Sequence, residues 1–329
     1  MAVGAAALFM HLAPTLGRGI KTAPHVSAGR AAAPRETGRP SEGPRSSTEA
    51  TGAAPLAAGR FASGDTSYRE TGCDTLSDVA DLVSSHQPGA LRATAEALAR
   101  RRYPTGLAFL QAQADRELAV WLTGAPESFA GVVSRFDSAV HEGAHFWGFK
   151  RFNHRTVSYP IRVDLTLETR RLTNFHRSEV LAHHVDAASD SYANTYLAGQ
   201  SGAQGFNSLL DEYNAYAHSL AARYCTRDLM PPNNRVSARD GILTMMYYVE
   251  VYLSVARTKH QADYAAILAD PGHRRLILTV WDRAEFFLRE TASLPALGIS
   301  DDRIEKWVYT PAGLEELALV RRTEQAVKR

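Results

Sequence analysis

The stretch that decides the fold runs from Ser128 to Trp147 and reads SFAGVVSRFDSAVHEGAHFW. Its apolar residues recur in steps of three and four, which is the period of one face of an α-helix. This face consists of Phe129, Val132, Val133, Phe136, Val140, Ala144 and Trp147. The pattern predicts a long amphipathic helix that begins near residue 127 or 128, directly after a Gly-Ala-Pro punctuation.

Most of the chain beyond residue 70 shows the same helical period. The expected helices cover residues 75–85, 91–102, 107–122, 178–198, 206–224, 236–258, 262–268, 273–294 and a last segment from residue 311. Thr156 to Glu168 instead alternates apolar and polar residues, which predicts a half-buried strand. Pro160 within it favours an edge position or a bulge. The expected fold class is therefore α+β, mainly α, with a small β-sheet.

The first 70 residues differ in composition from the rest. Between about Pro14 and Tyr68, large apolar residues are scarce, so the segment cannot bury enough surface to offset the entropy lost on folding. We expect a disordered leader or linker over residues 1–70 and one folded domain over residues 71–329. Ala5 to Met10 is apolar like the centre of an export signal, but no basic residue precedes it. A secreted or periplasmic location and a cytoplasmic one both stay open.

The bulk composition excludes several classes of protein. The net charge of +2 gives no electrostatic reason to expect a nucleic-acid partner. No apolar run reaches about 18 residues, so we expect no transmembrane segment. The only two cysteines, Cys73 and Cys225, are too few for a disulfide framework or a Cys-rich zinc site. They either form one bridge or stay two buried thiols. The oligomeric state is undetermined.

The helix predicted from residue 127 or 128, called the motif helix below, carries His141, Glu142 and His145 near its end in the pattern H-E-x-x-H. Two histidines four residues apart lie one turn apart on one helix face, so their imidazoles can reach one ion at about 2.0–2.1 Å. Zn²⁺ is the ion that suits such ligands. Glu142 lies beside the first histidine, where it can accept a proton from an activated water without binding the metal. Without a metal, the two histidines would be ordinary surface or core residues.

The pentapeptide HEGAH resembles the H-E-x-x-H motif of the zincin superfamily of metallopeptidases. This resemblance implies a zincin-like catalytic domain that cleaves peptide or protein substrates. It also implies that His141 and His145 bind zinc and that Glu142 is the general base.

A downstream segment is similar to the E-x-x-A-D helix of gluzincins. Glu212 and Ala215 are in register with that pattern, while Tyr216 stands where the family has Asp. The similarity implies that Glu212 is the third zinc ligand. A carboxylate that interrupts an apolar helix face needs a partner, and either a metal or a salt bridge would provide one.

Other residues compete for the third ligand position. Gly148 fits the metzincin pattern H-E-x-x-H-x-x-G-x-x-H, but Arg151 stands at its last position, and a protonated guanidinium cannot bind zinc. His154 follows one turn later and would need a different chain path. Asp186 or Asp190 on the next expected helix are further alternatives.

Several polar residues could assist such a site. Candidate donors toward an oxyanion are His218, Tyr213, Tyr216, Tyr247 and Tyr248. Asp211 could orient a zinc-binding histidine. His183 and His184 are neighbours whose side chains would point about 100° apart on a helix, so they predict no bidentate site. Glu250 interrupts an apolar helix without an evident reason.

The alternative to an enzyme is a non-catalytic zincin-like protein that binds a metal or a partner. A zinc with four closed protein ligands would be structural. The intact Glu142 argues against this hypothesis, because a structural site has no use for a base. In many zincins an edge strand before the motif helix holds an extended substrate. The strand expected here follows the motif helix, which departs from that pattern.

Overall fold

The computed structural model describes residues 61–70, 73, 76–122, 127–230 and 235–327. It is mainly helical with one two-stranded antiparallel sheet, so the predicted α+β class is confirmed. The elements before the sheet are α1 (Ala80–Ser85), α2 (Leu91–Arg102), α3 (Pro104–Ala112), α4 (Asp115–Leu122) and α5 (Phe129–Phe149). The elements after it are η2 (Arg177–His183), α6 (Ala193–Tyr196), α7 (Gly199–Gly202), α8 (Phe206–Cys225), η3 (Arg227–Leu229), α9 (Ala238–Lys259), α10 (Gln261–Ala269), α11 (Pro271–Glu290), η4 (Pro295–Leu297), α12 (Asp301–Val308) and α13 (Pro311–Val327).

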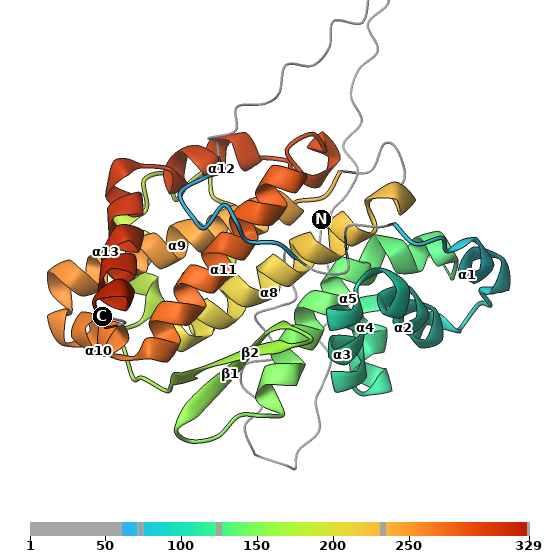
Figure 1. Ribbon diagram of the computed structural model, residues 1–329, viewed down its shortest axis with the longest axis horizontal. Helices are drawn as coiled ribbons and strands as arrows, with labels where there is room; N and C mark the ends of the chain where they lie inside the picture. Colours follow the sequence, from blue (N-terminus) through green and yellow to red (C-terminus); the bar gives the residue numbers. More distant parts are fainter. Residues whose placement is uncertain (1–60, 71–72, 74–75, 123–126, 231–234, 328–329) are drawn as a thin grey trace, which may run out of the picture. The chain divides into compact units, whose positions relative to one another are not determined.

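Helix α5 is the predicted motif helix, and it begins where the sequence places its cap. The Ser128 hydroxyl accepts the backbone N–H of Gly131 at 3.1 Å. The predicted apolar face is buried from Phe129 to Ala144, while Trp147 is half-buried. Helix α5 packs between α3 and α4 on one side and α8 on the other, and α8 in turn packs against α9 and α11 (Figure 1). The motif therefore lies at the centre of the helical packing.

Gly143 allows α3 to approach the motif closely. A Cβ atom at this position would lie 2.6 Å from the Phe109 carbonyl oxygen and 2.6 Å from Gln113 Nε2. The Gln113 amide also donates to the Ala139 carbonyl at 2.9 Å, which joins the two helices. The residue directly after Glu142 is thus glycine for reasons of packing.

The single strand predicted over residues 156–168 is wrong, because this segment is most of a hairpin. Strand β1 (Thr156–Arg162) pairs with β2 (Leu165–Arg170), with Ser158 opposite Glu168. The apolar alternation continues through the turn, and no glycine or asparagine marks it. The register shifts between Pro160 and Arg162, which confirms the irregularity predicted from the proline.

Helices contact both outer edges of the hairpin. The Pro160 carbonyl of β1 accepts hydrogen bonds from Asn214 Nδ2 at 2.9 Å and His218 Nε2 at 2.7 Å, both on α8. The Arg170 backbone N–H of β2 donates to Asp270 Oδ2, beside the start of α11, at 2.9 Å. The edges that another strand would pair with are thus engaged at these positions.

Two predicted helices are divided differently in the structure. Residues 107–122 belong to α3 and α4, because Gln113 is extended between them. Residues 178–198 hold η2, turns and α6 instead of one helix. There the side chains of His184 and Asp190 accept the backbone N–H groups of Asp186 at 3.0 Å and Tyr192 at 2.8 Å. Such local bonds compete with helical hydrogen bonding. Helix α12 was not predicted.

The start of the described region is tied to the helices. Cys73 and Cys225 form a disulfide with a Cα–Cα distance of 5.1 Å. Of the two alternatives for these cysteines, one bridge or two buried thiols, the bridge is present. Glu70 pairs with the buried Arg283 at 2.8 Å, and Phe61 is buried. Residues 61–70, assigned to the leader from composition, therefore pack with the folded domain. The rest of the predicted leader lies outside the described residues.

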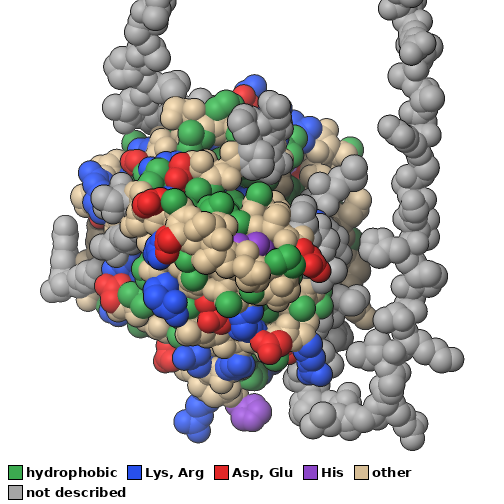
Figure 2. Space-filling model, turned by 90° about the vertical axis from the view of Figure 1, so that its right-hand side faces the viewer, with side chains coloured by type: hydrophobic (Ala, Val, Ile, Leu, Met, Phe, Trp, Pro, Cys, Tyr) green, Lys and Arg blue, Asp and Glu red, His purple; other side chains and the backbone are tan. Residues whose placement is uncertain are grey.

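Charge is distributed evenly on the face drawn in Figure 2, where basic and acidic side chains are interspersed with hydrophobic ones. This agrees with the small net charge. Within the described part of the chain, none of the helices combines the length and apolar character needed to span a bilayer.

Candidate metal centre

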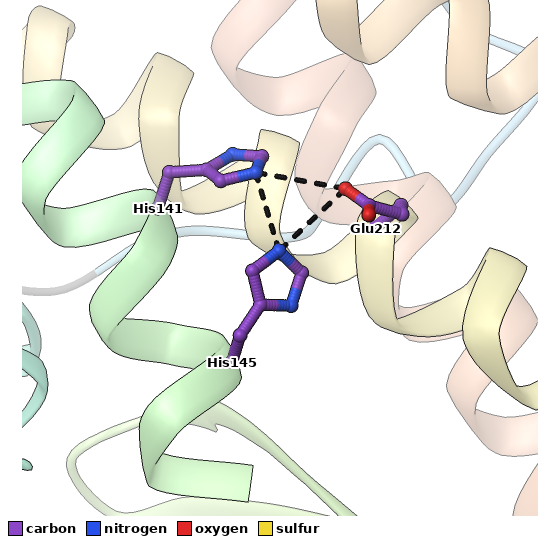
Figure 3. Close-up of side chains that lie close together, drawn as sticks. All are labelled: His141, His145 and Glu212. Atoms are coloured by element: carbon purple, nitrogen blue, oxygen red, sulfur yellow. Dashed lines mark hydrogen bonds and ion pairs between the residues drawn. The ribbon is translucent and has the colours of Figure 1, made fainter. Parts of the chain in front are cut away.

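His141 and His145 of α5 and Glu212 of α8 bring three potential ligand atoms together (Figure 3). The Nε2 atoms of the two histidines are 3.3 Å apart. Glu212 Oε2 lies 3.6 Å from the first of these nitrogens and 3.5 Å from the second. All three side chains are buried, with Glu212 only 1% exposed. The helix spacing therefore brings the two predicted histidines to one point, and the packing of α8 adds the predicted carboxylate.

These separations fit a single zinc ion. Zinc binds imidazole nitrogen and carboxylate oxygen at about 2.0–2.2 Å, and tetrahedral angles then place two ligand atoms about 3.3–3.5 Å apart. Glu212 Oε2 is buried, and its polar neighbours are the two imidazole nitrogens at 3.5 and 3.6 Å, too far for good hydrogen bonds. A buried carboxylate oxygen held only by such long contacts is costly, and a cation at this point would remove that cost. Two imidazoles and one carboxylate also form the ligand set of many catalytic zinc sites.

The other ring nitrogen of each histidine has a partner on α8. His145 Nδ1 is hydrogen-bonded to Asp211 Oδ2 at 2.7 Å, and His141 Nδ1 to Ser219 Oγ at 3.0 Å. With a proton on each Nδ1, the Nε2 lone pairs are free to face a metal. Asp211 thus occupies the orienting position that the sequence suggested. Ser219 was missed, although its spacing of seven residues from Glu212 places it two turns along the same helix face.

Electrostatics within the cluster favour mutual pairing. Burial lowers the pKa of His145, but the carboxylates of Asp211 and Glu212 outweigh it and hold that pKa well above its usual value. Burial likewise raises the pKa of Glu212, while His145 and His141 outweigh it and lower the pKa. The carboxyl group is therefore ionised and ready to act as a ligand.

Glu142 is buried on the same helix, with 7% of its surface exposed. Burial raises the pKa of its carboxyl group, and the two histidines oppose this shift. A carboxyl group with a raised pKa can both accept and return a proton near neutral pH. Glu142 is not one of the three clustered ligand residues, as the sequence predicted.

Among the five candidate donors, Tyr216 lies beside the cluster. Its ring contacts the His141 ring edge-on at 4.6 Å between centroids. Its hydroxyl is 2.7 Å from that of Tyr196, which was missed because residues 178–198 were expected to form a regular helix. Burial, together with the charge of Glu212, holds the pKa of both tyrosines well above the usual value, so both hydroxyls stay protonated donors.

The other candidate donors have partners elsewhere or lie apart from the cluster. His218 binds the Pro160 carbonyl, Tyr247 accepts the Val185 N–H at 2.9 Å, and Tyr248 donates to Asp190. Burial raises the pKa of Tyr213, and the charges of Asp282, Glu285 and Glu250 raise it further. These acids belong to α11 and α9, and none of them is a residue of the cluster.

The alternative third ligands do not join the three-residue cluster. Asp190 is paired with His184 Nε2 at 2.8 Å, and Asp186 is not part of the cluster. His154 is exposed, and Arg151 stacks on the Trp147 ring at 3.6 Å. His183 contacts Lys259 instead of sharing a site with His184. The structure therefore favours Glu212 over these alternatives.

Comparison of the chain with protein-family models, with curated proteins and with solved structures finds no match. The functional assignment therefore depends on the residues of the site and their geometry.

Proposed function

We propose that the protein is a zinc-dependent hydrolase, and specifically a metallopeptidase, with His141, His145 and Glu212 as the zinc ligands. The observation that carries the proposal is the triangle of buried ligand atoms with sides of 3.3, 3.5 and 3.6 Å, in which the two imidazoles lie too far from Glu212 Oε2 for good hydrogen bonds. Three protein ligands leave one position open, which is typical of catalytic and not of structural zinc sites. When bound, zinc supplies a Lewis acid that polarises a carbonyl group and makes water more acidic.

The protein's own residues would then divide the remaining work. Glu142 would take the proton of the attacking water and return it to the leaving amine. In the hydrogen-bonded pair of Tyr196 and Tyr216, one hydroxyl donates to the other, and the second hydroxyl would donate toward the negative charge that develops on the carbonyl oxygen. Asp211 and Ser219 would hold the two imidazoles in their metal-binding tautomers.

The disulfide between Cys73 and Cys225 supports a location for this activity. Disulfides persist in oxidising compartments and are rare in the cytosol. We therefore favour a secreted or periplasmic protein over a cytoplasmic one.

The test begins with the zinc content of the full chain, measured by elemental analysis. We expect about one zinc per chain in the wild type, and substantially less in Glu212→Ala. The zinc-loaded protein is then incubated with a mixture of unrelated peptides, and products are identified by mass spectrometry. Glu142→Gln is the matched control, because it keeps the ligands and removes the base.

We expect Glu142→Gln to retain its zinc and to lose at least about 100-fold in hydrolysis, since general acid–base groups typically contribute 10²–10⁴-fold. A wild-type protein that binds no zinc would refute the proposed site. A protein that binds zinc but cleaves no peptide would refute the peptidase and favour a non-catalytic metal-binding protein.

A further inference from the structure

A buried arginine near the candidate metal centre has donors that no protein group uses. Arg177, the first residue of η2, is fully buried. Its Nε donates to the Ser201 carbonyl oxygen and its Nη2 to Ser201 Oγ, each at 2.8 Å. Its Nη1 is buried and has no hydrogen-bond partner. A guanidinium group left partly unsatisfied in the interior is costly, so this end of the side chain invites an anion.

The geometry of the guanidinium group defines what would fit. Its five N–H donors lie in one plane and form forks that match the two oxygens of a carboxylate. Ser201 occupies the edge formed by Nε and Nη2. The remaining donors lie at the Nη1 end, where a planar carboxylate could be bound by two parallel hydrogen bonds.

Three contacts connect Arg177 to the zinc ligands. Its Cζ lies 5.7 Å from the centre of the Tyr196 ring. The Tyr196 hydroxyl is 2.7 Å from that of Tyr216, whose ring lies 4.6 Å from the ring of His141. In addition, Glu212 is the acid whose charge acts most strongly on Arg177. Arg177 is therefore linked to the metal ligands through Tyr196 and Tyr216, and the charge of Glu212 acts on it.

The outer edges of the hairpin are already engaged at two positions. Asn214 and His218 engage the outer edge of β1 at Pro160, and Asp270 engages that of β2 at Arg170. Main-chain pairing with a substrate would need these positions to be open. Side chains at the site therefore offer a separate means of recognising the peptide.

We infer that Arg177 binds the C-terminal carboxylate of the peptide substrate, so that the enzyme removes residues from the C-terminal end. This inference rests on the proposed function. The terminal carboxylate and the last peptide bond belong to consecutive residues, whose Cα atoms are about 3.8 Å apart. An anion-binding group that two tyrosines connect to the metal ligands is therefore placed to select a bond near the C-terminal end. Arg177 acts as a specificity-determining residue.

The experiment compares two peptides of identical sequence, one with a free C-terminal carboxylate and one with a C-terminal amide. The zinc-loaded full chain is incubated with each, and products and kcat/KM are determined by mass spectrometry. We expect cleavage at the C-terminal bond of the free peptide, with kcat/KM about 10- to 100-fold above that of the amide. This range is the effect of one hydrogen-bonded charge pair.

Three variants test the role of the side chain. Arg177→Met should lower kcat/KM for the free peptide about 10- to 100-fold, leave the value for the amide unchanged and keep the zinc content. Arg177→Lys should restore part of the preference, because it keeps the charge and loses the fork. Arg223→Met is the matched control: Arg223 is also buried, but both of its terminal nitrogens donate, to the Val133 and Ser134 carbonyls and to Asp137, so the ratio between the two peptides should not change.

Different failures have different meanings. If the wild type cleaves both peptides equally or at internal bonds, the inference about Arg177 falls while the metallopeptidase stands. If Arg177→Met loses zinc, or loses activity toward both peptides to the same extent, the residue is structural and the inference also falls. If the zinc-loaded wild type cleaves neither peptide nor any peptide of the mixture, the proposed function itself falls. The wild-type comparison decides the question even if Arg177→Met does not fold.

Discussion

The two histidines that we propose as zinc ligands have different partners, and this difference predicts different effects on zinc affinity. His145 Nδ1 is hydrogen-bonded to the Asp211 carboxylate at 2.7 Å, and His141 Nδ1 to the Ser219 hydroxyl at 3.0 Å. A carboxylate partner both orients the ring and increases its basicity, whereas a neutral hydroxyl mainly orients it. We therefore expect Asp211→Asn to weaken zinc binding more than Ser219→Ala does.

The structure sets the size of each effect. The bond to Asp211 is short and charge-assisted, and its aspartate is only 15% exposed, so solvent screens it weakly. Loss of such a partner typically costs 10- to 100-fold in metal affinity, or about 1.4–2.8 kcal/mol. The bond to Ser219 joins two neutral groups and contributes about 0.5–1.5 kcal/mol, which corresponds to about 2- to 13-fold.

Zinc affinity would be measured by competition with a chromophoric chelator at fixed neutral pH. Urea unfolding of the zinc-free variants is the control, since a change in folding would otherwise alter the apparent affinity. Equal affinities for Asp211→Asn and the wild type would refute the reasoning. A larger effect of Ser219→Ala than of Asp211→Asn would refute it as well, because charge would then not be the deciding term.

Three further predictions concern stability. Gly143→Ala should lower the free energy of unfolding by about 1–3 kcal/mol, because its Cβ would lie 2.6 Å from the Phe109 carbonyl; an unchanged urea midpoint would contradict the close approach of α3 to α5. Burial, and then the charge of Glu316, hold the pKa of Glu250 well above its usual value of 4.5, so the folded protein binds a proton at this group more strongly than the unfolded chain does. The stability that this group contributes is present at pH values below about 4.5 and is lost as the pH rises through the folded pKa. The free energy of unfolding of Glu250→Gln should therefore rise relative to that of the wild type over this range. Parallel pH profiles of unfolding for the two proteins would exclude this account. Cys73→Ser should lower the free energy of unfolding by about 2–4 kcal/mol by removing the disulfide to Cys225, and a reducing agent should lower the wild type to a similar value while leaving the variant unchanged.

The position of the motif helix could be predicted because its signals are local. The steps of three and four residues from Phe129 to Ala144 define its buried face, and Ser128 caps its start. Helices α2, α8 and α9 followed from the same period to within a few residues. The region 178–198 failed because side chains such as His184 and Asp190 bind nearby backbone groups, and hydrophobic periodicity does not register such bonds.

The candidate site was likewise predictable only in part from the sequence. The sequence by itself determined that His141 and His145 lie on one helix face beside Glu142, because a spacing of four residues is a property of the helix alone. It favoured Glu212 as the third ligand through a partial family resemblance and left other candidates open. The tertiary structure brings Glu212 to both imidazoles by packing α8 against α5, and it places Asp211 and Ser219 behind them. It also brings Tyr196 of α6 to Tyr216 of α8, and Arg177 of η2 to Tyr196. Contacts between residues far apart in the chain depend on how whole helices bury their faces, and no local pattern encodes that arrangement.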